Sequence, residues 1–215
     1  MKLALYDMDR TITRRSSWLP WLLFFARHEA PWRLLLLPLA LVPLALYPAL
    51  GRKGVKEAMQ WLLMGPSVTE DRVAARARAF AAAFGARAER PEALARIARD
   101  RAEGRVVVIV TASARYYVEA LAARWGVAHV LATENCRAGG RISHRIAGAN
   151  CYGAEKVARV RAWLAGRVPE SVRAYSDHPS DLPLLELAAE PVAVSPTPAL
   201  ARLAAVRGWP CVSWS

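Results

Sequence analysis

The sequence predicts an α/β fold in which a parallel sheet carries a long helical insertion. After residue 105, short β-branched runs alternate with segments of helical length, the order typical of a parallel sheet. Between the first and second predicted strands, residues 12–104 are mostly helical in pattern. Three apolar runs end beside Asp7, Thr111 and Asp177, and the carboxyl ends of parallel strands meet at one edge of a sheet. We therefore expect these three side chains to lie together.

The strands and helices are expected in the following order. Residues 2–6 form a buried strand, and 106–110 (Val-Val-Val-Ile-Val) form the second, because both runs are apolar throughout. Gly139 and Gly140 separate short polar–apolar alternations, which indicates a hairpin within 133–147. The other predicted elements are helices near 114–124, 153–165, 181–188 and 198–205, and strands at 128–132, 172–175, 191–194 and 209–214.

Composition limits the class of partner. The chain has 30 basic and 18 acidic residues, a net charge of +12, and is 54% apolar, so it is not disordered. A basic balance favours nucleic acid, anionic lipid or anionic metabolites. We find no zinc finger, RNA-binding signature or helix-turn-helix pattern, and we expect no nucleic-acid partner.

The cysteines and the first residues indicate the compartment. Cys136, Cys151 and Cys211 are an odd number without C-x-x-C spacing, which predicts reduced thiols and a cytoplasmic protein. We expect no cleavable signal, because Asp7 comes too early for the apolar region of a signal peptide.

Asp7 and Asp9 are the most informative pair in the sequence. Two carboxylates one residue apart at the end of a buried strand repel each other and resist desolvation. A bound cation relieves both problems. It would also let a carboxylate approach a phosphate ester, since two like charges about 4 Å apart cost about 4 kcal/mol at an effective dielectric near 20. The pair therefore predicts a magnesium-dependent phosphoryl-transfer centre.

Each candidate catalytic residue has a role in this chemistry. Asp7 would attack phosphorus in line and form an aspartyl-phosphate. Asp9 would protonate the leaving oxygen and then deprotonate the hydrolytic water. Lys156 would neutralise developing charge. Asp177 would complete the metal shell, and Asp181 would hold a metal-bound water or orient Lys156.

Thr111, Ala112 and Ser113 are the candidates for holding the phosphoryl oxygens. The Thr111 hydroxyl and the backbone N–H groups around Ala112, at the start of the following helix, would form the cradle. Each motif alone has an ordinary explanation as a loop, an N-cap, a surface lysine or a turn. The interpretation depends on all four occurring in this order, each at a strand end or helix start.

In this order, the motifs resemble those of haloacid dehalogenase (HAD) superfamily hydrolases. Motif one resembles Asp7–Thr11, motif two matches Thr111, motif three matches Lys156, and motif four matches Asp177 with Asp181. The insertion between motifs one and two is similar to that of the phosphoserine-phosphatase-like branch, subfamily IB.

The resemblance implies a HAD-like, Rossmann-like parallel sheet core of residues 1–12 and 105–215. Residues 13–104 would be an inserted α-helical cap. The resemblance also implies an aspartyl nucleophile and Mg²⁺ bound by the side chains of Asp7 and Asp177 and the carbonyl of Asp9. Arg10 departs from the family pattern, which usually has glycine there. Its side chain either reaches a second anionic group of the substrate or points into solvent.

An apolar Leu/Pro-rich segment, residues 34–50, has no charged residue. It is slightly shorter than the roughly 20 residues that span a bilayer, and tryptophans and basic residues flank it. Its prolines would cost about 3 kcal/mol each inside a soluble helix and are better tolerated in membranes. Two explanations remain open: interfacial or re-entrant insertion, and the buried core of a soluble cap. The basic flanking residues are Arg27, His28, Arg33, Arg52, Lys53 and Lys56.

The same segment, together with Cys151–Lys156 and Tyr175–Leu185, resembles the phosphatidylglycerophosphatase C enzymes. Three functions follow as hypotheses. The first is a cytoplasmic Mg²⁺-dependent phosphomonoesterase, peripheral or monotopic at the inner face of an anionic membrane, acting on a lipid headgroup or amphipathic phosphate. The second is a soluble phosphatase for a small phosphorylated metabolite such as phosphoserine or histidinol phosphate. The third is a non-catalytic regulatory protein.

Overall fold

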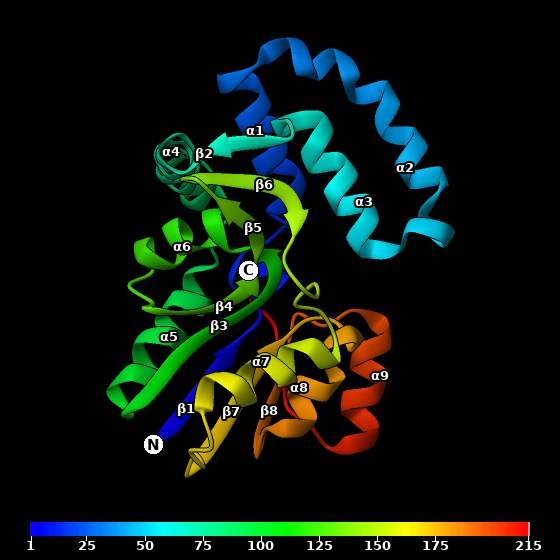
Figure 1. Ribbon diagram of the computed structural model, residues 1–215. Coiled ribbons are helices and arrows are strands. Elements are labelled where there is room, and N and C mark those ends of the chain that lie inside the picture. The colour runs from blue at the N-terminus through cyan, green and yellow to red at the C-terminus, as the bar shows by residue number, and fades with distance from the viewer. Residues whose placement is uncertain (215) are drawn as a thin grey trace.

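A six-stranded parallel sheet forms the centre of the protein, whose residues 1–214 are described by a computed structural model (Figure 1). The strand order is β4-β3-β1-β7-β8-β9, and each neighbouring pair is parallel. The predicted α/β class with a parallel sheet is therefore confirmed. The strands are β1 (Lys2–Tyr6), β3 (Arg105–Ala114), β4 (His129–Thr133), β7 (Ser171–Ser176), β8 (Glu190–Val194) and β9 (Cys211–Val212).

Side chains alternate along these strands and supply two separate hydrophobic clusters. Tyr6 and Ile109 point into one cluster, and Leu5 and Val110 into the other. Helices α5 (Pro91–Ala102) and α6 (Arg115–Arg124) cover the first face. Helices α7 (Ala154–Leu164), α8 (Leu182–Leu187) and α9 (Pro198–Arg207) cover the second (Figure 1). The sheet is thus buried on both sides, as parallel sheets generally are.

The segment between β1 and β3 is helical except for one short strand. It contains α1 (Trp18–Glu29), a 3₁₀ segment (Pro31–Ala40), α2 (Leu41–Ala45), α3 (Tyr47–Met64), β2 (Ser67–Thr69) and α4 (Glu70–Ala88). Strand β2 pairs with β6 (Arg141–Ile146), which pairs with β5 (Asn135–Ala138), in an antiparallel sheet. The hairpin turns at Gly139 and Gly140, which have φ of 53° and 67°, values that glycine adopts without strain. The predicted hairpin therefore joins the insertion through β2.

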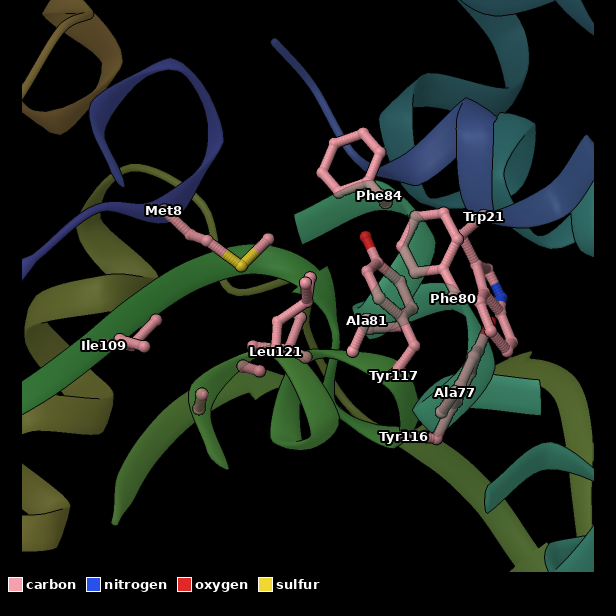
Figure 2. Close-up of a cluster of buried hydrophobic side chains, with 14 of the residues drawn as sticks. Met8, Trp21, Ala77, Phe80, Ala81, Phe84, Ile109, Tyr116, Tyr117 and Leu121 are labelled. Atoms are coloured by element: carbon pink, nitrogen blue, oxygen red, sulfur yellow. The ribbon is translucent and has the colours of Figure 1, made fainter. Parts of the chain in front are cut away.

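An aromatic cluster ties α1 and α4 to α6 (Figure 2). The ring of Trp21 lies 5.2 Å from Tyr117 in a stacked arrangement and 5.4 Å from Phe80 edge-on. Because α4 packs along α6, part of the predicted insertion lies on the sheet layer. The predicted division into residues 1–12 with 105–215 and residues 13–104 remains a proposal.

Two strand predictions were wrong in extent. Strand β3 continues to Ala114 after an irregularity in its pairing with β4, so Thr111 lies inside the strand and not beyond its end. The last strand is limited to Cys211–Val212, whereas 209–214 was predicted. In contrast, β7 ends at Ser176, and Asp177 follows directly, as expected.

The apolar segment 34–50 lies on the outside of the molecule. Leu35 is 80% exposed and Leu41 68% exposed, and only Ala40 and Pro43 in this run are buried. The explanation of the run as a buried cap core is therefore wrong. The backbone changes direction at Leu46 and at Gly51 (φ 61°), and none of the helices within residues 1–214 is long and apolar enough to cross a membrane.

Candidate active site

A pocket of about 280 Å³ lies at the carboxyl ends of β1, β3 and β7. Its wall contains eight of the nine residues that the sequence singled out: Asp7, Asp9, Arg10, Thr111, Ala112, Lys156, Asp177 and Asp181. It also contains five residues that were not predicted: Ser16, Arg52, Tyr152, His178 and Ser180. Segments far apart in the sequence therefore converge on one site.

Lys156 connects two of the buried carboxylates. Its Nζ atom donates to Oδ1 of Asp7 at 2.6 Å and to Oδ2 of Asp181 at 2.7 Å, and its side chain is only 2% exposed. Burial alone would lower the pKa of Lys156, but the carboxylates of Asp181 and Asp7 raise it above its ordinary value. These contacts place the ammonium group of Lys156 between two carboxylates, and its predicted role in the chemistry remains a proposal.

Asp7 and Asp177 face the same hydroxyl group. Oγ1 of Thr11 lies 3.3 Å from Oδ2 of Asp7 and 3.4 Å from Oδ1 of Asp177. Burial raises the pKa of Asp7 to about 8 against the opposing effect of Lys156, and burial also raises the pKa of Asp177. The protein thus crowds carboxylates that resist ionisation, an arrangement that a bound cation would stabilise.

The residues present fit a magnesium ion. Oδ1 of Asp181 is buried without a hydrogen-bond partner, and oxygen atoms are the ligands that Mg²⁺ prefers. No group of three or more His, Cys, Asp or Glu side chains among residues 1–214 is arranged to hold a metal by itself. A magnesium site here would therefore need backbone or water oxygens as well, which this ion readily accepts.

Asp9 is held at the edge of the pocket by two donors. The Ser17 N–H donates to its Oδ1 at 2.8 Å, and the Ser113 hydroxyl donates to its Oδ2 at 2.7 Å. The Ser17 hydroxyl in turn lies 3.0 Å from the hydroxyl of Tyr117, a member of the aromatic cluster. The cluster thereby contributes to fixing the orientation of Asp9.

Ser113 was predicted to bind phosphate, but the structure places it outside the pocket wall. Its hydroxyl donates to Asp9, and its N–H donates to Oγ1 of Thr111 at 3.1 Å. Thr111 and Ala112 do line the pocket. Of the predicted cradle, these two residues therefore remain the candidates for contacting a phosphoryl group.

Two basic residues of the insertion, Lys56 and Arg52, contact residues at or beside the pocket. From the sequence they were expected only to flank the apolar segment 34–50. Nζ of Lys56 donates to the carbonyl of Ala112 at 2.7 Å and to Oδ1 of Asn150 at 2.9 Å. Burial lowers the pKa of Lys56 to about 8. The Arg52 guanidinium lies 3.9 Å from the centre of the Tyr152 ring. No spacing in the sequence distinguishes Arg52 and Lys56 from their exposed neighbour Lys53, so only the fold reveals their position.

Comparison with known proteins identifies the family. A family model described as haloacid dehalogenase-like hydrolase matches residues 4–186. The chain belongs to this family of hydrolases, and the predicted membership is confirmed.

Two relatives and two solved structures illustrate the similarity. Protein CicA of Caulobacter vibrioides is 32% identical over 189 residues, 87% of this chain and 83% of that protein. A probable phosphatase of Mycobacterium tuberculosis is 37% identical over 126 residues, 58% of this chain but only 44% of the relative's length. A Bordetella pertussis protein of unknown function has a TM-score of 0.86 with 28% identity, covering 98% and 97% of the two chains. A substrate-bound phosphoserine phosphatase shares the fold, with a TM-score of 0.62, 16% identity and coverage of 98% and 92%.

Proposed function

We propose that this protein is a Mg²⁺-dependent phosphomonoesterase that forms an aspartyl-phosphate on Asp7. The observation that carries the proposal is the pocket in which Lys156 contacts Asp7 and Asp181 while Asp177 shares a hydroxyl donor with Asp7. Family membership and a relative named as a probable phosphatase support it.

The residues of the chain divide the chemistry between them. An oxygen of Asp7 forms a bond to phosphorus as the bond to the leaving alcohol breaks, and Asp9 gives that alcohol its proton. Asp9 then accepts a proton from the water that attacks phosphorus, which releases phosphate and restores Asp7. Lys156 offsets the negative charge on the phosphoryl oxygens. Thr111 and the Ala112 backbone hold these oxygens.

The side chains of Asp7 and Asp177, together with the Asp9 carbonyl and Asp181 directly or through water, would hold the magnesium ion. When bound, the ion supplies positive charge that favours ionised Asp7 and reduces repulsion from the incoming phosphate. HAD phosphatases generally use Mg²⁺, and the oxygen-only donor set agrees with that.

The exposed apolar segment supports a more specific form of the proposal. Ten large apolar residues between Trp32 and Leu50 are at least 37% exposed, with Arg33, Arg52 and Lys53 nearby in sequence. An apolar surface bordered by cations suits an anionic bilayer interface. We therefore propose that the substrate is a lipid or amphipathic phosphate and that the protein attaches peripherally to the cytoplasmic face of the membrane.

The function is tested by measuring phosphate release from chromogenic, soluble and lipid phosphomonoesters with Mg²⁺ and with EDTA. Magnesium-dependent release from any of them supports the phosphatase. Release from phosphoserine or histidinol phosphate alone, with no binding to anionic liposomes at low salt, favours the small-metabolite alternative. No release from any ester would leave a non-catalytic regulatory protein as the explanation.

A further inference from the structure

Two arginine side chains in the pocket wall form no hydrogen bond or ion pair with a carboxylate among the described residues 1–214 that would hold their guanidinium groups in place. Arg10 follows Asp9, and Arg52 comes from α3 of the insertion; both line the pocket and both are exposed. Within residues 1–214, neither guanidinium forms an ion pair or hydrogen bond with another protein group. In contrast, Lys156 in the same pocket is fully engaged by two carboxylates.

The backbone at Arg10 is in a conformation that a residue with a Cβ atom disfavours. Its φ and ψ are 66° and −4°, in the left-handed region where glycine is the unstrained residue. Strained residues persist where the surrounding structure and the function of a site maintain them. The chain therefore has an arginine at a backbone position where glycine would be free of strain.

Arg52 reaches the pocket from α3 of the insertion. Its guanidinium stacks on Tyr152, another residue of the pocket wall, at 3.9 Å. A stacked guanidinium keeps its N–H groups free at the rim of its plane, where they bind carboxylate or phosphate in a bidentate manner. One arginine from the core motif and one from the insertion thus border the same opening.

The charges in the pocket suggest what these arginines bind. The transferred phosphoryl group is already matched by Lys156 and by the metal that Asp7 and Asp177 would hold. Two further guanidinium groups exceed what one phosphomonoester needs.

We propose that Arg10 and Arg52 form a second anion-binding subsite, so that the preferred substrate carries a phosphate or carboxylate group on the alcohol released by hydrolysis. This inference rests on the proposed function and specifies its substrate class.

Another role for Arg10 has to be distinguished. Arg10 is among the charges that lower the pKa of Asp177, although burial and Asp181 raise it. If Arg10 acted only through Asp177, its loss would impair every substrate equally. A binding role instead predicts a loss confined to substrates with the second anion.

The experiment compares three phosphate esters that share a chain of three carbon atoms, in the presence of Mg²⁺. These are 3-hydroxypropyl phosphate, 3-phosphooxypropanoate and propane-1,3-diyl bisphosphate. We expect wild-type kcat/KM to be at least about tenfold higher for a doubly anionic ester, the effect of one charge-assisted hydrogen bond. The ratio of kcat/KM for a doubly anionic ester to kcat/KM for 3-hydroxypropyl phosphate is the preference to be measured. In Arg10→Gly and in Arg52→Gln this ratio should fall about fivefold or more, and in the double variant it should approach one.

Arg14→Gln is the matched control, because Arg14 is exposed, close in sequence and absent from the pocket wall. Its ratio should equal that of wild type. Arg10→Gly should also unfold at a higher temperature than wild type, since glycine relieves the left-handed strain. A melting temperature at least as high as that of wild type would show that the variant loses its preference for doubly anionic esters while it remains folded.

A second arm compares two lipids in mixed micelles. Diacylglycerol 3-phosphate releases an alcohol without an anion, whereas the diacylglycerol ester of propane-1,3-diyl bisphosphate keeps one phosphomonoester and releases an alcohol that carries a phosphodiester anion. An arginine-dependent preference in either arm supports the subsite, and the arm that shows it separates a lipid from a free ester. A ratio near one for wild type in both arms overturns the subsite, as does an equal loss for all three esters in Arg10→Gly. The phosphatase itself fails only if 3-hydroxypropyl phosphate and a chromogenic ester are also not hydrolysed.

Discussion

Nζ of Lys156 lies 2.6 Å from Oδ1 of Asp7, although 149 positions separate the two residues in the chain. The contact joins the first turn of α7 to the residue that follows β1. It places the buried ammonium group of Lys156 against the proposed nucleophile. The following predictions test what this contact and its surroundings do.

Replacing Asp7 by Asn should reduce Mg²⁺-dependent phosphate release at least about a thousandfold, because the amide cannot act as the nucleophile. The melting temperature should change little, since burial opposes the ionisation of Asp7 and Lys156 keeps its buried pair with Asp181. Steady-state assays and thermal unfolding measure the two effects. Turnover at a tenth of the wild-type rate or more would contradict the proposed role of Asp7.

Replacing Lys156 by Met should lower the free energy of unfolding by about 3–5 kcal/mol, because Asp7 and Asp181 lose their buried cation. Denaturant unfolding in EDTA measures this effect. Lys2→Met is the control, since Lys2 pairs with Glu170 at 3.9 Å on the surface and should lose at most about 1 kcal/mol. Equal losses in the two variants would show that the Lys156 contacts contribute no more than an exposed pair.

The free energy of unfolding should depend on pH through the ionisation of Lys56. In the folded protein burial lowers the pKa of Lys56 to about 8, whereas its ordinary value is 10.5. Between these values the unfolded chain binds more protons, so the free energy of unfolding should rise with pH for wild type relative to Lys56→Met. The titratable groups that act on Lys56 are Arg52, Asp9, Cys151 and Lys156.

Urea unfolding of the wild type and Lys56→Met at several pH values from 7 to 10.5 measures this difference. Lys53→Met provides the control, because Lys53 lies on the same helix and is exposed. A constant difference between wild type and Lys56→Met over this range would mean that Lys56 does not lose its proton early in the folded state.

The apolar segment should be needed for membrane binding and not for the chemistry. The triple substitution Leu35→Ser, Leu41→Ser and Val42→Ser changes side chains that are 80%, 68% and 56% exposed, so the fold should be retained. We expect binding to anionic liposomes to fall about tenfold or more, since each lost side chain removes apolar area from the interface. Hydrolysis of a soluble ester should remain within about twofold.

Val168→Ser with Val206→Ser is the matched control, because these valines are 89% and 87% exposed outside the segment. Liposome binding that is equally weak in both variants, or unchanged in the triple variant, would exclude the segment as the membrane contact.

Much of the core could be predicted because its signals are local. The Val-rich run from Val106 and the acids after Tyr6 identify two strands and the edge at which they end. Lys156 and Asp181 were found because each stands near a predicted helix start. The extension of β3 to Ala114 could not be predicted, since Ala-Ser-Ala after Thr111 has no strong strand preference and the pairing with β4 depends on the fold.

The contribution of the insertion was not predictable in the same way. Lys53 and Lys56 are three positions apart in one basic stretch, yet Lys53 donates to the carbonyl of Gly148 while Lys56 reaches Ala112. Likewise, Leu36 packs against the core while Leu35 is exposed. Such differences arise from how α3 and the 3₁₀ segment lie on the core, which residue type and spacing do not specify.

Trapping of the covalent intermediate tests the central claim most directly. Wild-type protein is mixed with a chromogenic phosphomonoester and Mg²⁺, quenched with acid and treated with borohydride, which reduces an aspartyl-phosphate to homoserine, and position 7 is then examined by peptide mass spectrometry. We predict homoserine at position 7 that depends on both substrate and Mg²⁺. Magnesium-dependent phosphate release with position 7 unmodified, or with the modification on another aspartate, would contradict the account.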